Sequence, residues 1–199
     1  MSLSKARELL EFAAGKDRLT RHLAVAAALR QVLSGDPIVV GGTAEEFWTA
    51  DEYGETDLDL CAPLRPVDLT TLEALGFESE GRHWYHPHAQ VAVEFPEARI
   101  DGDEARTHEE RVGSGSARII GTDDLYLDRL RQATSKPDRE DVEFKSALAV
   151  AAARYEEIDW DYVSQRIRNP QHTDPALAKI MKRLDSKIRR RARAVITEP

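Results

Sequence analysis

Cysteine and long apolar segments are both scarce in this chain of 199 residues. The single cysteine, Cys61, cannot form an internal disulfide, and its apolar surroundings favour a buried, reduced thiol over a catalytic one. No apolar run approaches the length that a bilayer requires, and the N-terminus lacks the apolar core of a secretory signal. These absences together predict a cytoplasmic protein.

The signatures of several enzyme classes are missing as well. No Gly-Lys-Ser/Thr follows the pair Gly41-Gly42, which excludes a Walker-type phosphate loop. The third glycine of a dinucleotide-binding fingerprint is absent. A Gly-x-Ser-x-Gly elbow is absent too, so nothing supports a serine hydrolase. A hydrophobic content of 41% nevertheless predicts a folded chain with one or two domains.

A glycine pair is the first positive signal. The apolar residues 38–40 predict a strand, Gly41 and Gly42 predict a turn, and a helix is expected to begin near Thr43. Glycine lets a backbone approach a ligand closely, and the amide groups at a helix start bind anions. This segment is therefore a candidate phosphate site.

A pair of carboxylates follows on the next predicted strand, Asp57-Leu58-Asp59-Leu60. Because side chains alternate along a strand, Asp57 and Asp59 should share one face while the leucines point into the core. Two neighbouring carboxylates repel each other unless a cation lies between them, and oxygen ligands suit magnesium. The glycine turn and the acidic strand together predict a site for a nucleoside triphosphate and its metal.

This order of elements resembles the DNA polymerase β-like nucleotidyltransferase superfamily, in particular its small stand-alone bacterial and archaeal members. The matching runs are Gly41-Gly42-Thr43-Ala44 and Thr56-Asp57-Leu58-Asp59-Leu60, within roughly residues 36 to 100. The resemblance implies an α/β (α+β) fold, with a small mixed β-sheet core flanked by helices and a helical C-terminal region. It also implies Mg²⁺ or Mn²⁺, a nucleoside triphosphate such as ATP, and phosphate contacts from Gly41, Gly42, Thr43 and Thr56.

The same superfamily has a third carboxylate on a neighbouring strand. Val91-Ala92-Val93-Glu94-Phe95 predicts a strand with one apolar face, which leaves Glu94 on the other face. Glu94 is therefore the candidate third metal ligand, although an exposed edge-strand face would also explain it. Asp101 and Asp103 are alternatives, but Asp101-Gly102-Asp103 is more typical of a turn.

The remaining pattern divides the chain into a core, residues 1–121, and a helical region, residues 122–199. Helices are expected over 3–14, 18–33, 43–50, 68–75, 123–134, 139–155, 159–167 and 175–194. Strands are expected over 38–40, 57–61, 77–80, 83–86, 90–95 and 118–120, with a turn at Pro87-His88 and a flexible loop at Gly113–Ser116.

On the first helix of the C-terminal region, Arg129 takes the place where the superfamily often has a basic residue that meets the triphosphate. Arginine can bind phosphate there, but Arg129 could equally pair with Asp128 or Asp124.

Three histidines, His83, His86 and His88, cluster near the predicted turn and raise the possibility of zinc. His83 and His86 fall on opposite strand faces and no cysteine joins them, so a solvated or substrate-facing hairpin is the preferred interpretation.

Positive charge gathers near the C-terminus. Residues 179–193 carry eight basic residues against one acid, a charge of +7, so the rest of the chain must carry −15 to give the net charge of −8. This basic segment could contact nucleic acid or a protein partner. Because no aromatic residue is interleaved for base stacking, a solvated helix is the preferred interpretation.

The leading hypothesis is a metal-dependent nucleotidyltransferase, with Asp57, Asp59 and Glu94 as catalytic metal ligands. The resemblance suggests an RNA end, a protein hydroxyl in a toxin–antitoxin pair, or an antibiotic hydroxyl as the acceptor. The alternatives are a non-catalytic module on the same fold, which binds a nucleotide or an antitoxin-like protein partner, and a plain nucleic-acid binder that uses the basic segment.

Overall fold

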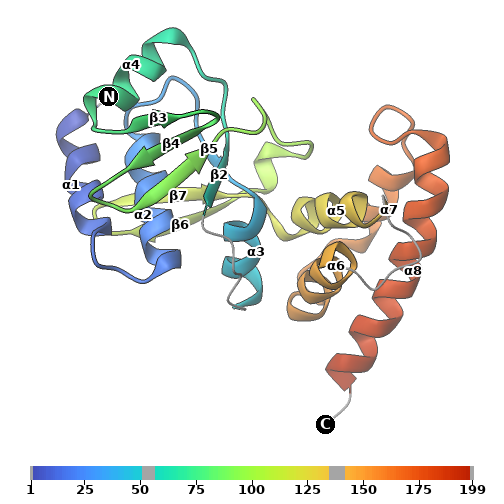
Figure 1. The fold of residues 1–199 in the computed structure, drawn as a ribbon. Coiled ribbons are helices and arrows are strands. Elements are labelled where there is room, and N and C mark those ends of the chain that lie inside the picture. Colours follow the sequence, from blue (N-terminus) through green and yellow to red (C-terminus); the bar gives the residue numbers. More distant parts are fainter. Residues whose placement is uncertain (1, 51–56, 135–141, 198–199) are drawn as a thin grey trace. The chain divides into compact units, whose positions relative to one another are not determined.

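A computed structural model of the chain describes residues 2–50, 57–134 and 142–197. The chain forms two compact units (Figure 1). The sheet unit comprises Met1–Phe47 and Asp51–Ile120, and the helical unit comprises Trp48–Ala50 and Gly121–Pro199.

The described part of the sheet unit is built on seven strands in the order β3-β4-β5-β2-β1-β7-β6. Two neighbouring pairs, β2 with β5 and β1 with β7, run parallel, and the other pairs are antiparallel. The strands are β1 (Ile38–Val39), β2 (Asp57–Cys61), β3 (Glu78–Glu80), β4 (His83–His86), β5 (Val91–Glu94), β6 (His108–Val112) and β7 (Gly115–Ile119). The sheet is therefore mixed, with β2 and β5 near its middle.

Helices flank this sheet. Helix α1 packs against α2, and α2 packs against β1, β5, β6 and β7. The run Ala24–Ala28 of α2 is almost fully buried, since small side chains let a helix approach a sheet closely. The helices of this unit are α1 (Leu3–Ala13), α2 (Arg18–Arg30), α3 (Gly41–Thr49) and α4 (Pro66–Ala74), with a short 3₁₀ turn at Glu104–Arg106; the last two residues of α3 fall in the helical unit.

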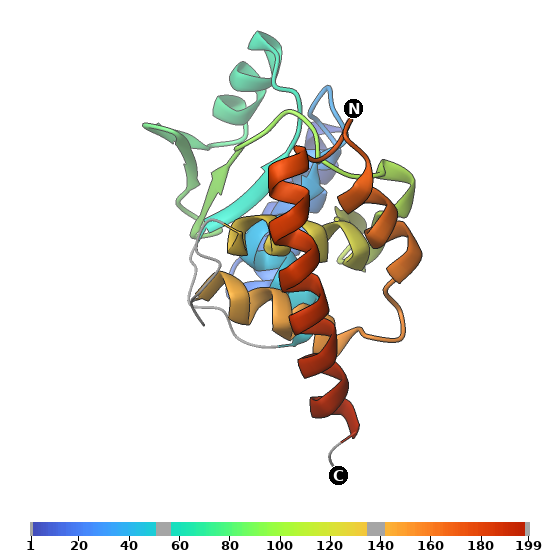
Figure 2. The same ribbon diagram turned by 90° about the vertical axis from the view of Figure 1, so that its right-hand side faces the viewer.

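The helical unit packs α5 (Thr122–Ala133) against α6 (Val142–Ala153) and α7 (Trp160–Arg168). The long helix α8 (Pro175–Thr197) lies along α6 and α7, as Figure 2 shows. Proline at the first position of α8 suits a helix start, because proline has no amide hydrogen to satisfy. Tyr126 and Phe144 are among the largest fully buried side chains.

The predicted fold class is confirmed: a mixed β-sheet core flanked by helices is followed by a helical C-terminal region. The predicted loop at Gly113–Ser116 was wrong, because Gly113 and Ser114 form a tight turn between β6 and β7, and β6 had not been predicted. Helix α3 also begins at Gly41, two residues earlier than expected. Among the described residues, no helix is both long enough and apolar enough to cross a membrane.

Candidate metal and nucleotide site

The register of the sheet brings the predicted acidic residues to neighbouring positions. On β2, Leu58 and Leu60 are buried whereas Asp57 and Asp59 are partly exposed, as the alternation of a strand requires. Asp59 lies opposite Glu94 of the parallel strand β5. Adjacent strands are about 4.8 Å apart, so these two carboxylates start from neighbouring backbone positions.

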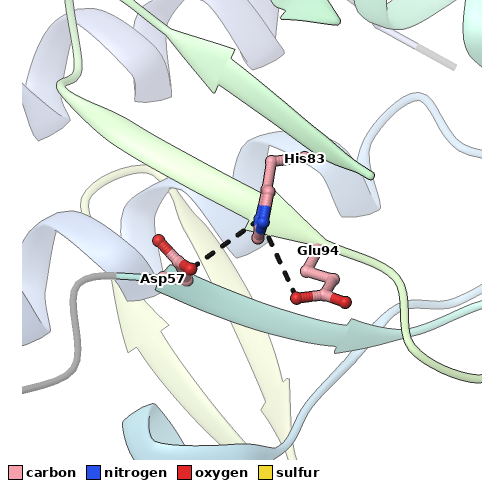
Figure 3. A group of neighbouring side chains, drawn as sticks. All are labelled: Asp57, His83 and Glu94. Atoms are coloured by element: carbon pink, nitrogen blue, oxygen red, sulfur yellow. Dashed lines mark ion pairs between the residues drawn. The ribbon is translucent and has the colours of Figure 1, made fainter. Parts of the chain in front are cut away.

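A histidine joins this group from the next strand. His83 of β4 lies opposite Glu94, so Asp59, Glu94 and His83 form one row across three strands. The Nδ1 atom of His83 is 3.7 Å from Asp57 Oδ2 and 3.8 Å from Glu94 Oε2. Figure 3 shows the three side chains pointing toward one another, and one ligand atom from each lies within 4.8 Å of the others.

This donor set fits a divalent cation. Two carboxylates and an imidazole converge on one face of the sheet, and none of the three side chains is fully buried, so solvent reaches the group. Carboxylate oxygens suit Mg²⁺ and Mn²⁺, whereas an imidazole nitrogen suits transition ions. Arg82 adds a positive charge beside the group, with its Nη1 atom 3.3 Å from Glu94 Oε1.

The glycine turn lies directly against the acidic strand. Gly41 has a φ of +63°, a conformation that favours glycine, and a Cβ atom placed there would collide with the carboxylate of Asp59. The backbone nitrogen of Val40 donates to the Asp59 carbonyl at 3.0 Å. The start of α3 and the carboxylate of Asp59 are therefore adjacent, which the sequence motif required but could not show.

The hydroxyl of Thr43 does not face a ligand, as a phosphate contact from the side chain would require. The side chain is buried, and its hydroxyl lies 2.8 Å from Nδ1 of the buried His22 on α2. The hydroxyl is thus used inside the fold, so a phosphate contact from Thr43 would have to come from its backbone amide. Such amides at the start of a helix have no partner within the helix.

The pKa of His22 is also shifted by its surroundings. Burial, followed by the positive charges of Arg21 and Arg18, lowers the pKa of His22 to about 4, against a smaller opposing effect of Asp57. His22 is therefore neutral at physiological pH. Of these two arginines, Arg18 is paired with Glu46 at 2.8 Å, so part of the positive charge beside His22 is neutralised within the fold.

Three further residues were candidates from the sequence, namely Thr56, Arg129 and Asp103. Thr56 is outside the described residues. Arg129 belongs to the helical unit, where its Nη1 atom donates to Gln132 at 3.0 Å and lies 4.0 Å from Asp128. Asp103 caps the 3₁₀ turn by accepting from the nitrogen of Ala105, consistent with a turn rather than a ligand.

The three histidines near the β4–β5 turn make three separate sets of contacts. His86 is buried, accepts from the nitrogen of Ala89 and lies 3.2 Å from the carbonyl of Leu75. His88 pairs with Glu11 at 2.9 Å. Only His83 of the three joins the acidic group, and sequence reasoning had not assigned it there.

The basic segment 179–193 lies within α8, and several of its cations contact aromatic rings. Arg189 lies 4.3 Å from the ring centre of Trp160 and donates to the buried Asp185 at 2.8 Å. Lys187 and Arg191 lie over Phe144 at 4.7 and 5.4 Å. The aromatic partners come from other helices of the unit, so part of this charge packs inside the helical unit.

No protein-family profile matches this sequence, and no curated protein shows significant sequence similarity to it. Among solved structures, the chain is similar to the crystal structure of an antigenic nucleotidyltransferase-like protein from Paracoccidioides brasiliensis, with a TM-score of 0.51 and 14% identity. The match covers 85% of this chain and 94% of that protein. The chain has a nucleotidyltransferase-like fold. At this level of identity the likeness establishes the fold alone.

Proposed function

We propose that the protein is a nucleotidyltransferase that uses a divalent cation to move a nucleoside monophosphate from a nucleoside triphosphate to an acceptor hydroxyl or phosphate. The main support is the sheet register, which sets Asp59 beside Glu94 with Asp57 on the same face. The adjacent glycine turn at Gly41 supports the same proposal, because a cation site and an anion site then lie side by side.

Each residue has a defined task in this proposal. Asp57, Asp59 and Glu94 would hold Mg²⁺ or Mn²⁺, which when bound offsets the charge of the triphosphate. The amides of Gly42 and Thr43 would hold phosphate oxygens, and Arg129 remains a proposed phosphate contact.

Proton transfer completes the reaction. As the acceptor oxygen forms its bond to the α-phosphorus, the bond to pyrophosphate breaks, and Glu94 or Asp59 accepts the acceptor's proton. The acceptor would be an RNA end, a protein hydroxyl of a toxin–antitoxin pair, or an antibiotic hydroxyl.

Transfer of a radioactive label tests this proposal. The protein is incubated with each nucleoside triphosphate, Mg²⁺ or Mn²⁺, and RNA, protein or aminoglycoside fractions. A label on the α-phosphate should enter one acceptor class, whereas a label on the γ-phosphate should not, because pyrophosphate leaves. The double variant Asp57→Asn, Asp59→Asn should remain folded and transfer nothing. Absence of transfer, together with melting curves that no metal or nucleotide shifts, would favour the non-catalytic module that binds a protein partner.

Alanine at Gly41 and at Gly15 tests the turn together with the Asp59 carboxylate that the turn touches. Gly41→Ala introduces both backbone strain and a collision with Asp59, whereas Gly15→Ala introduces comparable strain, at φ +74°, with no atom within 4 Å. Both variants should lose some stability. Only Gly41→Ala should also lose triphosphate affinity, measured by titration calorimetry on folded protein, and equal affinities would argue against the turn as a phosphate site.

A further inference from the structure

We infer that His83 is a metal ligand together with Asp57 and Glu94, and that its nitrogen makes the site prefer a transition ion such as Mn²⁺ over Mg²⁺. This inference rests on the proposed function for the two carboxylates. It adds to the carboxylates a ligand of different chemistry and, with it, the class of metal that the site selects.

The position of His83 is built into the sheet. Backbone pairing sets His83 opposite Glu94, and Glu94 opposite Asp59, so the imidazole cannot leave the acidic face without a change of register. The Nδ1 atom of His83 faces the two carboxylates, at 3.7 Å from Asp57 Oδ2 and 3.8 Å from Glu94 Oε2. These separations are slightly longer than hydrogen bonds and slightly wider than those between neighbouring ligands of one ion, which are about 3 Å.

The Nδ1 atom itself is poorly satisfied by protein contacts. It is buried, and among the described residues it has no hydrogen-bond partner. A buried polar atom without a partner is destabilising, and such atoms are rare in folded proteins. An ion held between Asp57 and Glu94 would satisfy this nitrogen as well as the two carboxylates.

Arg82 shows which nitrogen carries the ring proton. The Nε atom of Arg82 lies 3.1 Å from His83 Nε2, and arginine can only donate, so Nε2 must be the acceptor. In the neutral ring the proton is then on Nδ1, facing the acids. Ligation through Nδ1 requires the other tautomer, in which Nε2 carries hydrogen and can no longer accept from Arg82.

Arg82 and a metal ion should therefore compete for the same two residues. Arg82 contacts both His83 and Glu94, and its own side chain is 75% exposed, so it is free to move into solvent. Replacing it by glutamine removes a positive charge and offers an oxygen that can accept from Nε2–H. Arg82→Gln should bind Mn²⁺ more tightly than the wild type.

Metal binding to the full chain without nucleotide tests the inference. Titration calorimetry with Mn²⁺ and Mg²⁺ would compare the wild type with His83→Asn, which puts an oxygen where Nδ1 was. The ratio of Mn²⁺ to Mg²⁺ affinity should fall at least tenfold in His83→Asn, and Arg82→Gln should gain severalfold in Mn²⁺ affinity. His88→Asn removes an exposed imidazole that also contacts a carboxylate, and it should behave like the wild type.

A spectroscopic measurement does not depend on any variant. Electron spin-echo spectra of bound Mn²⁺ should show coupling to a nitrogen nucleus in the wild type and in His88→Asn, but not in His83→Asn. A wild-type spectrum without nitrogen coupling would overturn the assignment of His83, and loss of Mn²⁺ binding in Asp57→Asn would then show that the carboxylate site stands alone. No Mn²⁺ or Mg²⁺ binding in any form of the protein would overturn both this inference and the proposed function.

Discussion

Two groups of acidic side chains, one from each unit, differ in their surroundings. In the helical unit, the buried Asp123 accepts from the nitrogen of Asp159, and Asp124 accepts from the hydroxyl of Tyr162. In the sheet unit, Asp57 and Glu94 meet each other and one imidazole on a face that solvent reaches. Acids that receive donors from their own unit hold helices together, whereas acids gathered on an accessible face are arranged for a ligand.

Asp57 of the sheet unit and Asp185 of the helical unit differ in burial. Asp185 is buried, and it accepts from the hydroxyl of Tyr126 at 2.9 Å and from Arg189 at 2.8 Å. Burial, and then the Asp185 carboxylate, raise the pKa of Tyr126 well above its ordinary value, so the tyrosine stays a hydrogen-bond donor. Asp185 is therefore a structural acid, which predicts that its loss affects stability rather than metal binding.

Alanine at each position should separate the two kinds of acid. Asp185→Ala leaves the buried Tyr126 hydroxyl without its acceptor and should lower the free energy of unfolding by about 4 kcal/mol. Asp57→Ala removes a charge from an acidic group and should change it by about 0.5 kcal/mol at most when no metal is added. Urea denaturation measures both values.

A second substitution shows whether the loss at Asp185 has the stated cause. Adding Tyr126→Phe to Asp185→Ala removes the orphaned hydroxyl, so the double variant should be less destabilised than the sum of the two single variants. Strict additivity would mean that the Tyr126 hydroxyl does not depend on Asp185, and a large loss in metal-free Asp57→Ala would mean that Asp57 is a structural acid.

Sequence patterns predicted well wherever one local period decided the structure. The alternation of Asp57, Leu58, Asp59 and Leu60 fixed which side chains share a face, and the burial of the two leucines agrees with it. The described helices of the C-terminal region also followed from their periodicity. These features depend on residues only a few positions apart.

The place of His83 could not be predicted in this way, because it depends on the register of a hairpin. A turn limited to Pro87-His88 would pair His83 with Ala92. The actual connection spans Pro87–Gln90, with Gln90 in a left-handed conformation at φ +53°, and it pairs His83 with Glu94. A non-glycine residue rarely adopts that conformation, so the sequence carries little sign of the longer turn. The β6–β7 hairpin was missed because its glycines are typical of a flexible loop as well as of a tight turn.

In the sheet unit, the stability should depend on pH through His22, whose Nδ1 atom lies 2.8 Å from the hydroxyl of Thr43 at the proposed phosphate turn. Its pKa of about 4 in the folded protein is below the ordinary value of 6.5, so the unfolded chain binds more protons between these values. Stability should therefore fall as the pH drops from 6.5 to 4, by about 3 kcal/mol from this group.

Urea denaturation of the wild type and of His22→Gln across this pH range measures the effect. The variant keeps an amide that can bond to Thr43 but cannot be protonated, so its unfolding free energy should vary less with pH. Parallel profiles for the two proteins would mean that His22 is not held neutral by burial and the neighbouring arginines.

The smallest expected effect separates two neighbouring arginines of α8. Arg189 lies over Trp160 and donates to Asp185 and to the hydroxyl of Ser164, whereas Arg190 is exposed. Arg189→Gln and Arg190→Gln change the net charge equally, so the difference between them reports these contacts and not the overall charge. Arg189→Gln should lower the free energy of unfolding by about 2 kcal/mol and Arg190→Gln by less than about 0.5 kcal/mol. Equal effects would mean that the contacts of Arg189 add no stability, and that its charge is as available to a partner as that of Arg190.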